Sequence, residues 1–215
     1  MRSCPRALCY FGLLAPLWMV VSVTYSGTIY PGYSHIDQAM SELHAVGSPI
    51  ERIAPFIMHY PLSILFAGFG FFVMSYFSSR PAKVSGFLIL LHGVATFSAG
   101  YFPCDVGCAP EGTSTSQILH GVSGLGVLVT LFIAPAIWVF ISKRELKIVW
   151  FGWLSAAVLI GQILMMIPVM EAMTTRENLG LYQRLAYSIP LTWLFVFALL
   201  LIRDNRNGRP AGVGP

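Results

Sequence analysis

The sequence predicts an all-α, polytopic membrane protein: a bundle of six transmembrane helices with a short amphipathic helix on its outer surface. Of its 215 residues, 56% are apolar and only 10% are charged, whereas a soluble domain carries about 25% charged residues. The mean hydropathy is +0.71. So few charges cannot cover the surface of a soluble globule. The same composition excludes a disordered chain, a nucleic-acid-binding arm and a disulfide-knotted secreted domain.

Six stretches are long and apolar enough to cross a bilayer, since about 20 residues of helix span about 30 Å of hydrocarbon. They are 7–26, 55–77, 84–102, 117–141, 148–170 and 185–202. The first follows Arg2 and Arg6, as a signal peptide would, but its apolar run is longer than the usual 7–15 residues. We therefore expect it to be retained. The domain prediction is a transmembrane domain over 1–202 and a disordered cytoplasmic tail over 203–215.

The basic residues predict the orientation of the spans. Ten of the 13 lie in the N-terminal segment, two short loops and the tail: Arg2, Arg6, Arg80, Lys83, Lys143, Arg144, Lys147, Arg203, Arg206 and Arg209. The positive-inside rule then places both termini in the cytoplasm, and we expect the membrane to be the plasma (inner) membrane. The net charge of +4 thus reflects topology, and we expect membrane lipids rather than nucleic acid as partners.

The first outer loop contains the pattern of a short helix between Ser34 and Gly47. Ser34 and Asp37 have capping-box spacing, and a glycine suits the position after a helix. Apolar residues recur between them at helical spacing, at Ile36, Met40, Leu43 and Gly47. We expect an amphipathic helix along the outer surface, with Asp37, Ser41 and His44 on its polar face.

The second outer loop contains two cysteines and an acidic residue. Cys104 and Cys108 lie on the side of the membrane that is oxidising, which favours a small disulfide, and a redox pair is the alternative. Asp105 follows the third span, where an ionisable group needs a partner, and Arg184 and His120 are the candidates. Ser114 and Gln117 have capping-box spacing and predict the start of the fourth span.

The histidines raise the question of a metal. His59 and His120 lie at similar depths in the membrane. Bis-histidine haem ligation requires such matched depth, but it is the only requirement that the two residues meet, so haem is disfavoured. Zinc is chemically suited to histidine and carboxylate ligands. Its candidates are a subset of His35, His44, His59, His120 and Asp105, with His59, His120 and Asp105 foremost. No tight spacing such as HxxxH supports a metal site, and no cofactor is predicted.

Four segments of the outer loops carry a family resemblance. They are YSHIDQAMSEL at 33–43, FPCD at 102–105, LHG at 119–121 and GLYQR at 180–184. With these segments the chain resembles the domain-of-unknown-function family 998 of prokaryotic membrane proteins. The resemblance implies a six-helix membrane protein and no particular activity. The resemblance suggests that six residues occupy positions that the family pattern marks: Ser41, Glu42, Asp105, His120, Gln183 and Arg184. Cys104 and Cys108 depart from that pattern.

Three functions remain open. The favoured one is binding or moving a lipid or small amphiphile at an outward-facing polar site, with Arg184 and His120 holding the polar head. Its expected residues are Glu42, Asp105, His120, Gln183 and Arg184. The first alternative is a membrane-embedded hydrolase or transferase, with His120 as general base, Asp105 orienting it or holding metal, and Ser41 as nucleophile. The second is a structural or assembly protein. The sequence does not predict an oligomeric state.

Overall fold

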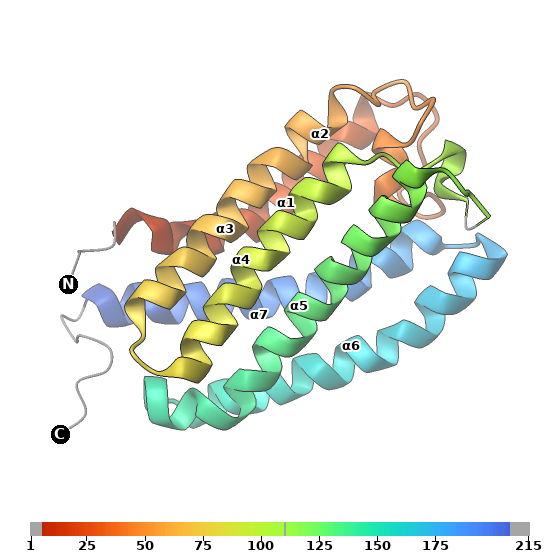
Figure 1. Cartoon of the computed structure of the whole chain (residues 1–215). Helices are drawn as coiled ribbons and strands as arrows, with labels where there is room; N and C mark the ends of the chain where they lie inside the picture. Colours follow the sequence, from red (N-terminus) through yellow and green to blue (C-terminus); the bar gives the residue numbers. More distant parts are fainter. Residues whose placement is uncertain (1–5, 110, 207–215) are drawn as a thin grey trace.

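The structure, a computed structural model, describes residues 6–109 and 111–206, which contain helices and no strands. Six long helices form the bundle in Figure 1: α1 (Phe11–Thr28), α3 (His59–Tyr76), α4 (Arg80–Tyr101), α5 (Thr115–Leu146), α6 (Val149–Thr175) and α7 (Leu179–Arg206). The short helices are η1 (Arg6–Tyr10), η2 (Met40–His44), α2 (Ala54–Ile57) and η3 (Val106–Cys108). All six spans are long and apolar enough to cross a membrane. The predicted all-α class with six spans is confirmed.

The long helices pack mainly on their neighbours in the chain. α3 packs on α4, α4 on α5, α5 on α6 and α6 on α7, while α1 closes the bundle against α3 and α7. The core is rich in buried aromatic side chains, including Trp138, Trp193 and Phe197. Both indoles donate to serine hydroxyls at 2.9 Å, Trp138 to Ser85 and Trp193 to Ser155. These bonds satisfy polar groups that would otherwise be buried without partners.

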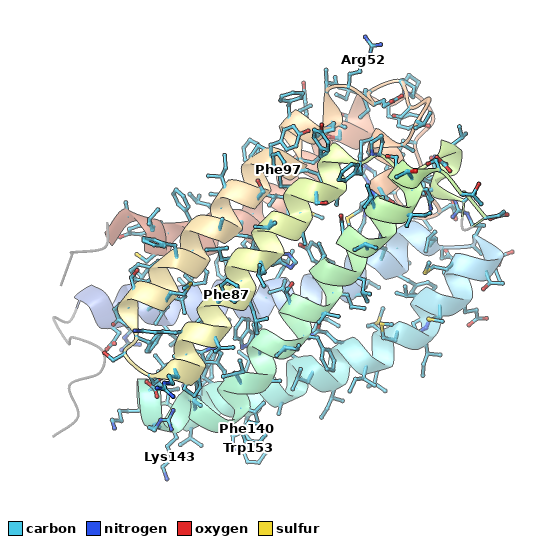
Figure 2. All side chains as sticks on the ribbon, viewed as in Figure 1. Arg52, Phe87, Phe97, Phe140, Lys143 and Trp153 are labelled. Carbon is cyan, nitrogen blue, oxygen red and sulfur yellow. A yellow bond between two sulfur atoms is a disulfide. The ribbon has the colours of Figure 1, made fainter. Side chains whose placement is uncertain are left out.

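The two ends of the bundle differ in their loops. The start of α1, the end of α7 and the short α3–α4 and α5–α6 connections lie together at one end (Figure 1). We call this the inner end, and the opposite end, with residues 29–53, 102–114 and 176–178, the outer end. Lys143 and Arg52 lie at these two ends (Figure 2). The two short loops rich in basic residues therefore lie at the same end of the bundle as the start of α1 and the end of α7.

Several helices are longer than the apolar stretches that predict them. α7 begins at Leu179 rather than at 185 and continues through Arg206. Its first turns contain Gln183 and Arg184, whose side chains bond to the first outer loop. Because these polar groups have partners, the helix extends beyond its apolar run. Residues 203–206, predicted to be disordered, are helical, and the rest of the predicted tail, 207–215, lies outside the described residues.

A kink at Met58 separates α2 from α3. Pro61 lacks an N–H and cannot bond the carbonyl of Ile57 four residues before it. The indole of Trp18 in α1 donates to that carbonyl instead, at 2.9 Å. The kink leaves His59 as the first residue of α3, at the outer end of the bundle.

The first outer loop does not form the predicted amphipathic helix. Ser34 does cap the N–H of Asp37, at 3.1 Å, but the loop contains only the 3-10 helix η2. Side chains take the N–H groups that a longer helix would use: Glu42 accepts from Ala39 at 2.9 Å and Gln183 accepts from Met40 at 2.7 Å. The prediction that His44 lies on an exposed polar face is wrong, because its side chain is completely buried. In contrast, Ser114 caps α5 as predicted, accepting from the N–H of Gln117.

Candidate functional site

Arg184, in the second turn of α7, is surrounded by uncharged hydrogen-bond acceptors. Its guanidinium donates to the carbonyls of Gln38 and Gly180 at 3.1 and 2.8 Å, and to the Tyr33 hydroxyl at 2.7 Å. It also lies 3.1 Å from Nδ1 of His35 and 5.7 Å from the centre of the Tyr33 ring. In the described part of the chain, no carboxylate lies within ion-pair distance of Arg184. Among these residues, the positive charge of Arg184 therefore forms no ion pair.

The pKa values of the two titratable neighbours of Arg184 confirm that they stay neutral. Burial lowers the pKa of His35 below its usual 6.5, and the charge of Arg184 lowers it further. Burial raises the pKa of Tyr33 above its usual 10.0, although Arg184 opposes this shift. At neutral pH neither group carries a charge. The groups that contact the Arg184 guanidinium are thus polar and neutral.

Gln183, beside Arg184, has a positioning role. Its carbonyl oxygen accepts from the N–H of Met40 at 2.7 Å and fixes the start of η2 against α7. The same loop supplies Gln38 to Arg184. Two consecutive residues of α7 therefore hold the first outer loop.

Glu42 pairs with Arg176, a residue that the sequence reasoning missed. The ion pair measures 3.2 Å, and Glu42 also accepts from Ala39 and from the amide of Gln38. Arg176 donates to the carbonyl of Gly107 at 2.5 Å. It directly follows α6 and has left-handed backbone geometry. One guanidinium thereby joins α6, η2 and the second outer loop.

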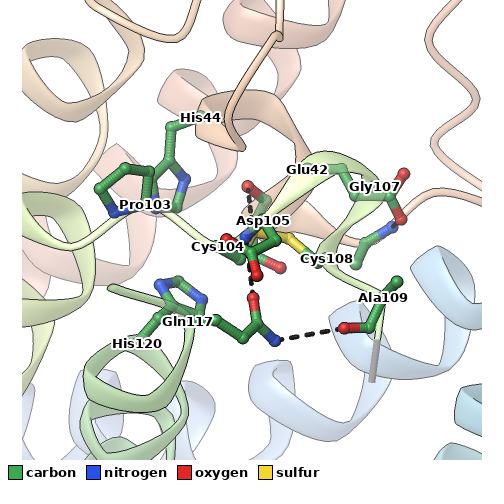
Figure 3. The surroundings of a disulfide bond; sticks show 12 residues. Glu42, His44, Pro103, Cys104, Asp105, Gly107, Cys108, Ala109, Gln117 and His120 are labelled. Atoms are coloured by element: carbon green, nitrogen blue, oxygen red, sulfur yellow. Dashed lines mark hydrogen bonds between the residues drawn. A yellow bond between two sulfur atoms is a disulfide. The ribbon is translucent and has the colours of Figure 1, made fainter. Parts of the chain in front are cut away.

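Asp105 is used within its own loop, which corrects the prediction that Arg184 or His120 is its partner. Its carboxylate accepts from the hydroxyl and the N–H of Ser114 at 2.5 and 3.3 Å. Its own N–H donates to Gln117 at 2.8 Å (Figure 3). A disulfide joins Cys104 to Cys108 and closes the same turn (Figure 3). Because the Asp105 carboxylate bonds Ser114, the N-cap residue of α5, it also complements the helix dipole.

Three histidines gather at the outer end: His44 from η2, His59 from α3 and His120 from α5. The ring centres of His44 and His59 are 4.3 Å apart, and those of His44 and His120 are 5.4 Å apart. His44 Nε2 and His120 Nδ1 lie 3.0 and 3.1 Å from one acceptor, the carbonyl of Ala99. We call these three residues the histidine cluster. The sequence had indicated similar depth for His59 and His120 but no contact with His44.

Burial and a neighbouring imidazole keep His44 neutral. Desolvation, together with the charge that His120 would carry, lowers the pKa of His44 from 6.5 to about 4. Nδ1 of His44 and Nδ1 of His59 are buried and have no hydrogen-bond partner. Such atoms are rare in folded proteins, and each calls for an explanation.

The members of the predicted polar cluster therefore do not bond one another directly, although Arg184 and Glu42 both bond Gln38. Arg184 and Gln183 face the first loop, Glu42 pairs with Arg176, Asp105 caps its own turn, and His120 belongs to the histidine cluster. No hydrogen bond in residues 6–109 and 111–206 joins His120 to Asp105, or the Ser41 hydroxyl to a histidine. The acid, base and nucleophile of the hydrolase hypothesis are thus not aligned with one another.

Two hollows open at the outer end. The larger, ≈ 230 Å³, is lined by residues 48–53, and the smaller, ≈ 70 Å³, lies beside Glu42, Tyr30 and Gly107. Of the predicted binding residues, only Glu42 lines either hollow. Neither volume reaches the ≈ 300 Å³ typical of a small-molecule pocket. Arg184 lines neither of these two hollows.

Comparison with known proteins gives one finding. The family model for a protein of unknown function, DUF998, matches residues 13–200. No curated protein and no solved structure matches the chain.

Proposed function

The chain belongs to the DUF998 family, whose function is unknown, and from its outer end we propose that it binds or moves an anionic lipid or small amphiphile. The observation that carries the proposal is that Arg184 forms no ion pair among the described residues. Four neutral acceptors orient its guanidinium without neutralising it. These contacts use the four terminal N–H groups, so an anion would meet the positive charge of the guanidinium and its Nε–H group, which makes no hydrogen bond among the described residues. Hydrogen bonds between arginine and an anionic group are stronger than those between neutral groups. An anionic head group is therefore the ligand that this environment favours.

The surroundings of Arg184 suit an amphiphile rather than a soluble anion. Leu181 and Leu185 lie on the same side of α7, since residues three and four apart share a helix face. They are 39% and 46% exposed. Arg184 lies about 8 Å along α7 from its first residue, at 1.5 Å per residue. The polar head would meet the guanidinium while the acyl chain covers the leucines.

The other predicted residues have supporting roles in this proposal. Gln183 and Glu42 fix the loop that presents Gln38 and Tyr33 to Arg184. His120 does not share a network with Arg184, so the idea that both hold one head group is given up. Asp105 stabilises the neighbouring loop.

The distribution of basic residues supports a location and an orientation. We infer that both termini lie in the cytoplasm, as the positive-inside rule predicts, and that the membrane is a prokaryotic plasma membrane, as the family resemblance implies. Arg184 then lies at the outer leaflet. Alkaline phosphatase fused after Gly112 should be active, whereas the same enzyme fused after Lys83 should be inactive. The reverse pattern would refute this orientation.

A structural role is the second candidate, and the contacts of Arg176 favour it. Its guanidinium bridges Glu42 and Gly107, and the Asp105 carboxylate is bonded by Ser114. In this structural role, the polar groups hold the outer loops in place through hydrogen bonds and one ion pair. The two candidates differ in what they predict for Arg184. Lipid binding requires its charge, whereas a structural role requires only its hydrogen bonds to the first outer loop.

The test compares lipid binding by the wild type with two matched arginine variants. Protein in neutral detergent is titrated with phosphatidylglycerol or phosphatidylcholine, and bound lipid is counted by native mass spectrometry. A charged hydrogen bond contributes about 1.5–3 kcal/mol, so Arg184→Gln should weaken phosphatidylglycerol binding about 10- to 100-fold. The control is Arg52→Gln, because Arg52 is an exposed arginine of the same outer end. It should change binding less than about twofold.

Two outcomes would refute the proposal. One is equal binding of the two lipids by the wild type. The other is an equal loss in the two variants. Arg184→Lys keeps the charge and should retain part of the preference, which separates a lost charge from a misfolded chain.

A further inference from the structure

We propose that residues 33–44 of the first outer loop compete with the anionic ligand for Arg184, and that acid releases them through His35 and His44. This inference rests on the proposed lipid site and names its regulation. Its basis is a histidine near each end of the segment, each packed against a positive or protonatable group. His35 contacts the Arg184 guanidinium, and His44 contacts two further imidazoles.

The segment occupies most of the donors that an anion would use. The Arg184 guanidinium donates to three of its groups, at 2.7, 3.1 and 3.1 Å: the Tyr33 hydroxyl, Nδ1 of His35 and the carbonyl of Gln38. The fourth acceptor is the carbonyl of Gly180, which belongs to α7 itself. Release of the segment would free N–H groups on both terminal nitrogens, as paired bonds to a phosphate require. The segment and the ligand therefore exclude one another at these groups.

Protonation of His35 would break its contact with Arg184. An arginine is always charged and only donates, so Nδ1 of His35 accepts through its lone pair. A protonated imidazole has no lone pair and would add a second positive charge beside the guanidinium. The nearest acidic side chain in the segment, Asp37, accepts from the Ser34 hydroxyl. Burial and the charge of Arg184 already lower the pKa of His35 below 6.5.

His44 is held in a second place that disfavours a proton. Its ring is completely buried, with the ring centres of His59 and His120 at 4.3 and 5.4 Å. Its Nε2 donates to the carbonyl of Ala99, and its Nδ1 is buried without a hydrogen-bond partner. A second proton would therefore create a buried, charged N–H group that lacks an acceptor, which is costly. Protonated His44 is stable only where water reaches the ring, after release of the segment.

The charged groups around η2 do not offset this cost. Among residues 6–109 and 111–206, no carboxylate lies within ion-pair distance of His35 or His44. Helix α2 contains no titratable residue, and α4 presents a carbonyl to the ring. The titratable groups on the other packed elements, beside His59 and His120, have partners or exposure of their own: Glu42 pairs with Arg176, Asp105 bonds Ser114, Arg184 bonds the start of the segment, and Tyr25 of α1 is 53% exposed.

Uncharged hydrogen bonds keep the segment closed at neutral pH. The side chain of Gln183 accepts from Met40 at 2.7 Å, and the N–H of Leu181 donates to the carbonyl of Ile36 at 2.8 Å. None of these groups titrates, so protons act against a constant closing free energy. The Leu181 amide also reports on release, because it then loses its acceptor.

The direction and size of the pH effect follow from proton linkage. Burial and the charge that His120 would carry lower the pKa of His44 to about 4 in the closed form, against about 6.5 in water. The released segment binds more protons between these values, so its population rises as the pH falls through this range. For His44 alone, the rise is about 30-fold between about pH 7.5 and about pH 5.0. His35 acts in the same direction.

The first measurement is hydrogen–deuterium exchange of the full chain in neutral detergent, at about pH 7.5 and about pH 5.0, corrected for the intrinsic effect of pH. Protection of residues 38–45 and of the Leu181 amide should fall at least about 30-fold at the lower pH. Residues 50–57 are the internal control and should change less than about twofold. The double variant His35→Gln, His44→Gln should lose the pH dependence, whatever its absolute protection. Arg52→Gln should keep it.

The second measurement titrates the same samples with phosphatidylglycerol, whose phosphodiester stays ionised at both pH values. The wild type should bind it at least about threefold more tightly at the lower pH, because a larger fraction of the chain is released. Phosphatidylcholine should bind equally at both. Neither Arg184→Gln nor the double variant should show the rise.

Three results would overturn the proposal. One is a change in protection below about threefold in the wild type, and another is an equal change in the double variant. The third is release without tighter phosphatidylglycerol binding, which would show that the segment does not compete with the ligand. Failure of the lipid proposal itself looks different, because Arg184→Gln and Arg52→Gln would then bind phosphatidylglycerol equally at about pH 7.5, whether or not the segment is released.

Discussion

Replacing Arg176 with glutamine tests whether one side chain holds the outer loops together. In the wild type its guanidinium lies 3.2 Å from Glu42 and 2.5 Å from the carbonyl of Gly107. Glu42 is only 7% exposed. The Arg176→Gln variant therefore leaves a buried carboxylate without its charged partner. Its remaining hydrogen bonds come from Ala39 and Gln38.

The size of the effect follows from burial. Removing one member of a buried ion pair costs about 3–5 kcal/mol. The Arg176 side chain is 38% exposed, so water screens the pair, and we take the lower end of that range. We expect a loss of about 3 kcal/mol in the free energy of unfolding. For a chain of this length that corresponds to a Tm lower by about 6–12 °C.

The assay is thermal or denaturant unfolding in detergent, applied to a double-mutant cycle with Glu42→Gln. We expect a coupling of about 1–3 kcal/mol between the two positions. Arg52→Gln is the control, because it removes an exposed outer arginine, and it should change stability by less than about 0.5 kcal/mol. A loss below about 1 kcal/mol for Arg176→Gln, or a coupling of zero, would refute the reasoning.

Three further predictions concern the same end of the bundle. A methyl group added by Gly100→Ala would lie 2.7 Å from Cγ of His59, and such overpacking should cost about 1–3 kcal/mol of unfolding free energy. Replacing Cys104 and Cys108 with serine opens a very short loop and should cost about 2 kcal/mol, measured by the same unfolding assay. Because the pKa of His44 is about 4 when folded and about 6.5 when unfolded, stability measured in chelator should be constant above pH 6.5. It should fall by about 3 kcal/mol as the pH drops to 4, and His44→Gln should remove this fall.

Each of these predictions has a control or a contrary result. Gly121→Ala is the control for Gly100, because nothing lies within 4 Å of a methyl group there, and it should be neutral or stabilising. Equal melting of oxidised and reduced wild type would contradict the disulfide prediction. An unchanged acid dependence in His44→Gln would show that another group is responsible.

The candidate site was predictable in its location but not in its pairings. Asp105 and Arg184 stood out as charges near the membrane boundary, yet Asp105 bonds Ser114, nine residues away, and Arg184 bonds neutral groups. Arg176 is eight residues before Arg184, and either arginine was within reach of the acidic groups of the outer loops. Only the packing of α6 and α7 brings Arg176 to Glu42, across 134 residues of sequence.

By itself, the sequence determined the six spans, the separation of basic and acidic loops and the Ser114 cap of α5. These features depend on residues close together in the chain, because apolar length, flanking charge and a capping hydroxyl act locally. The tertiary structure decided that the first outer loop is a short 3-10 turn and that His44 is buried against His59 and His120. Those outcomes depend on which helices meet at the outer end, since side chains from distant segments compete for the same backbone and charged groups.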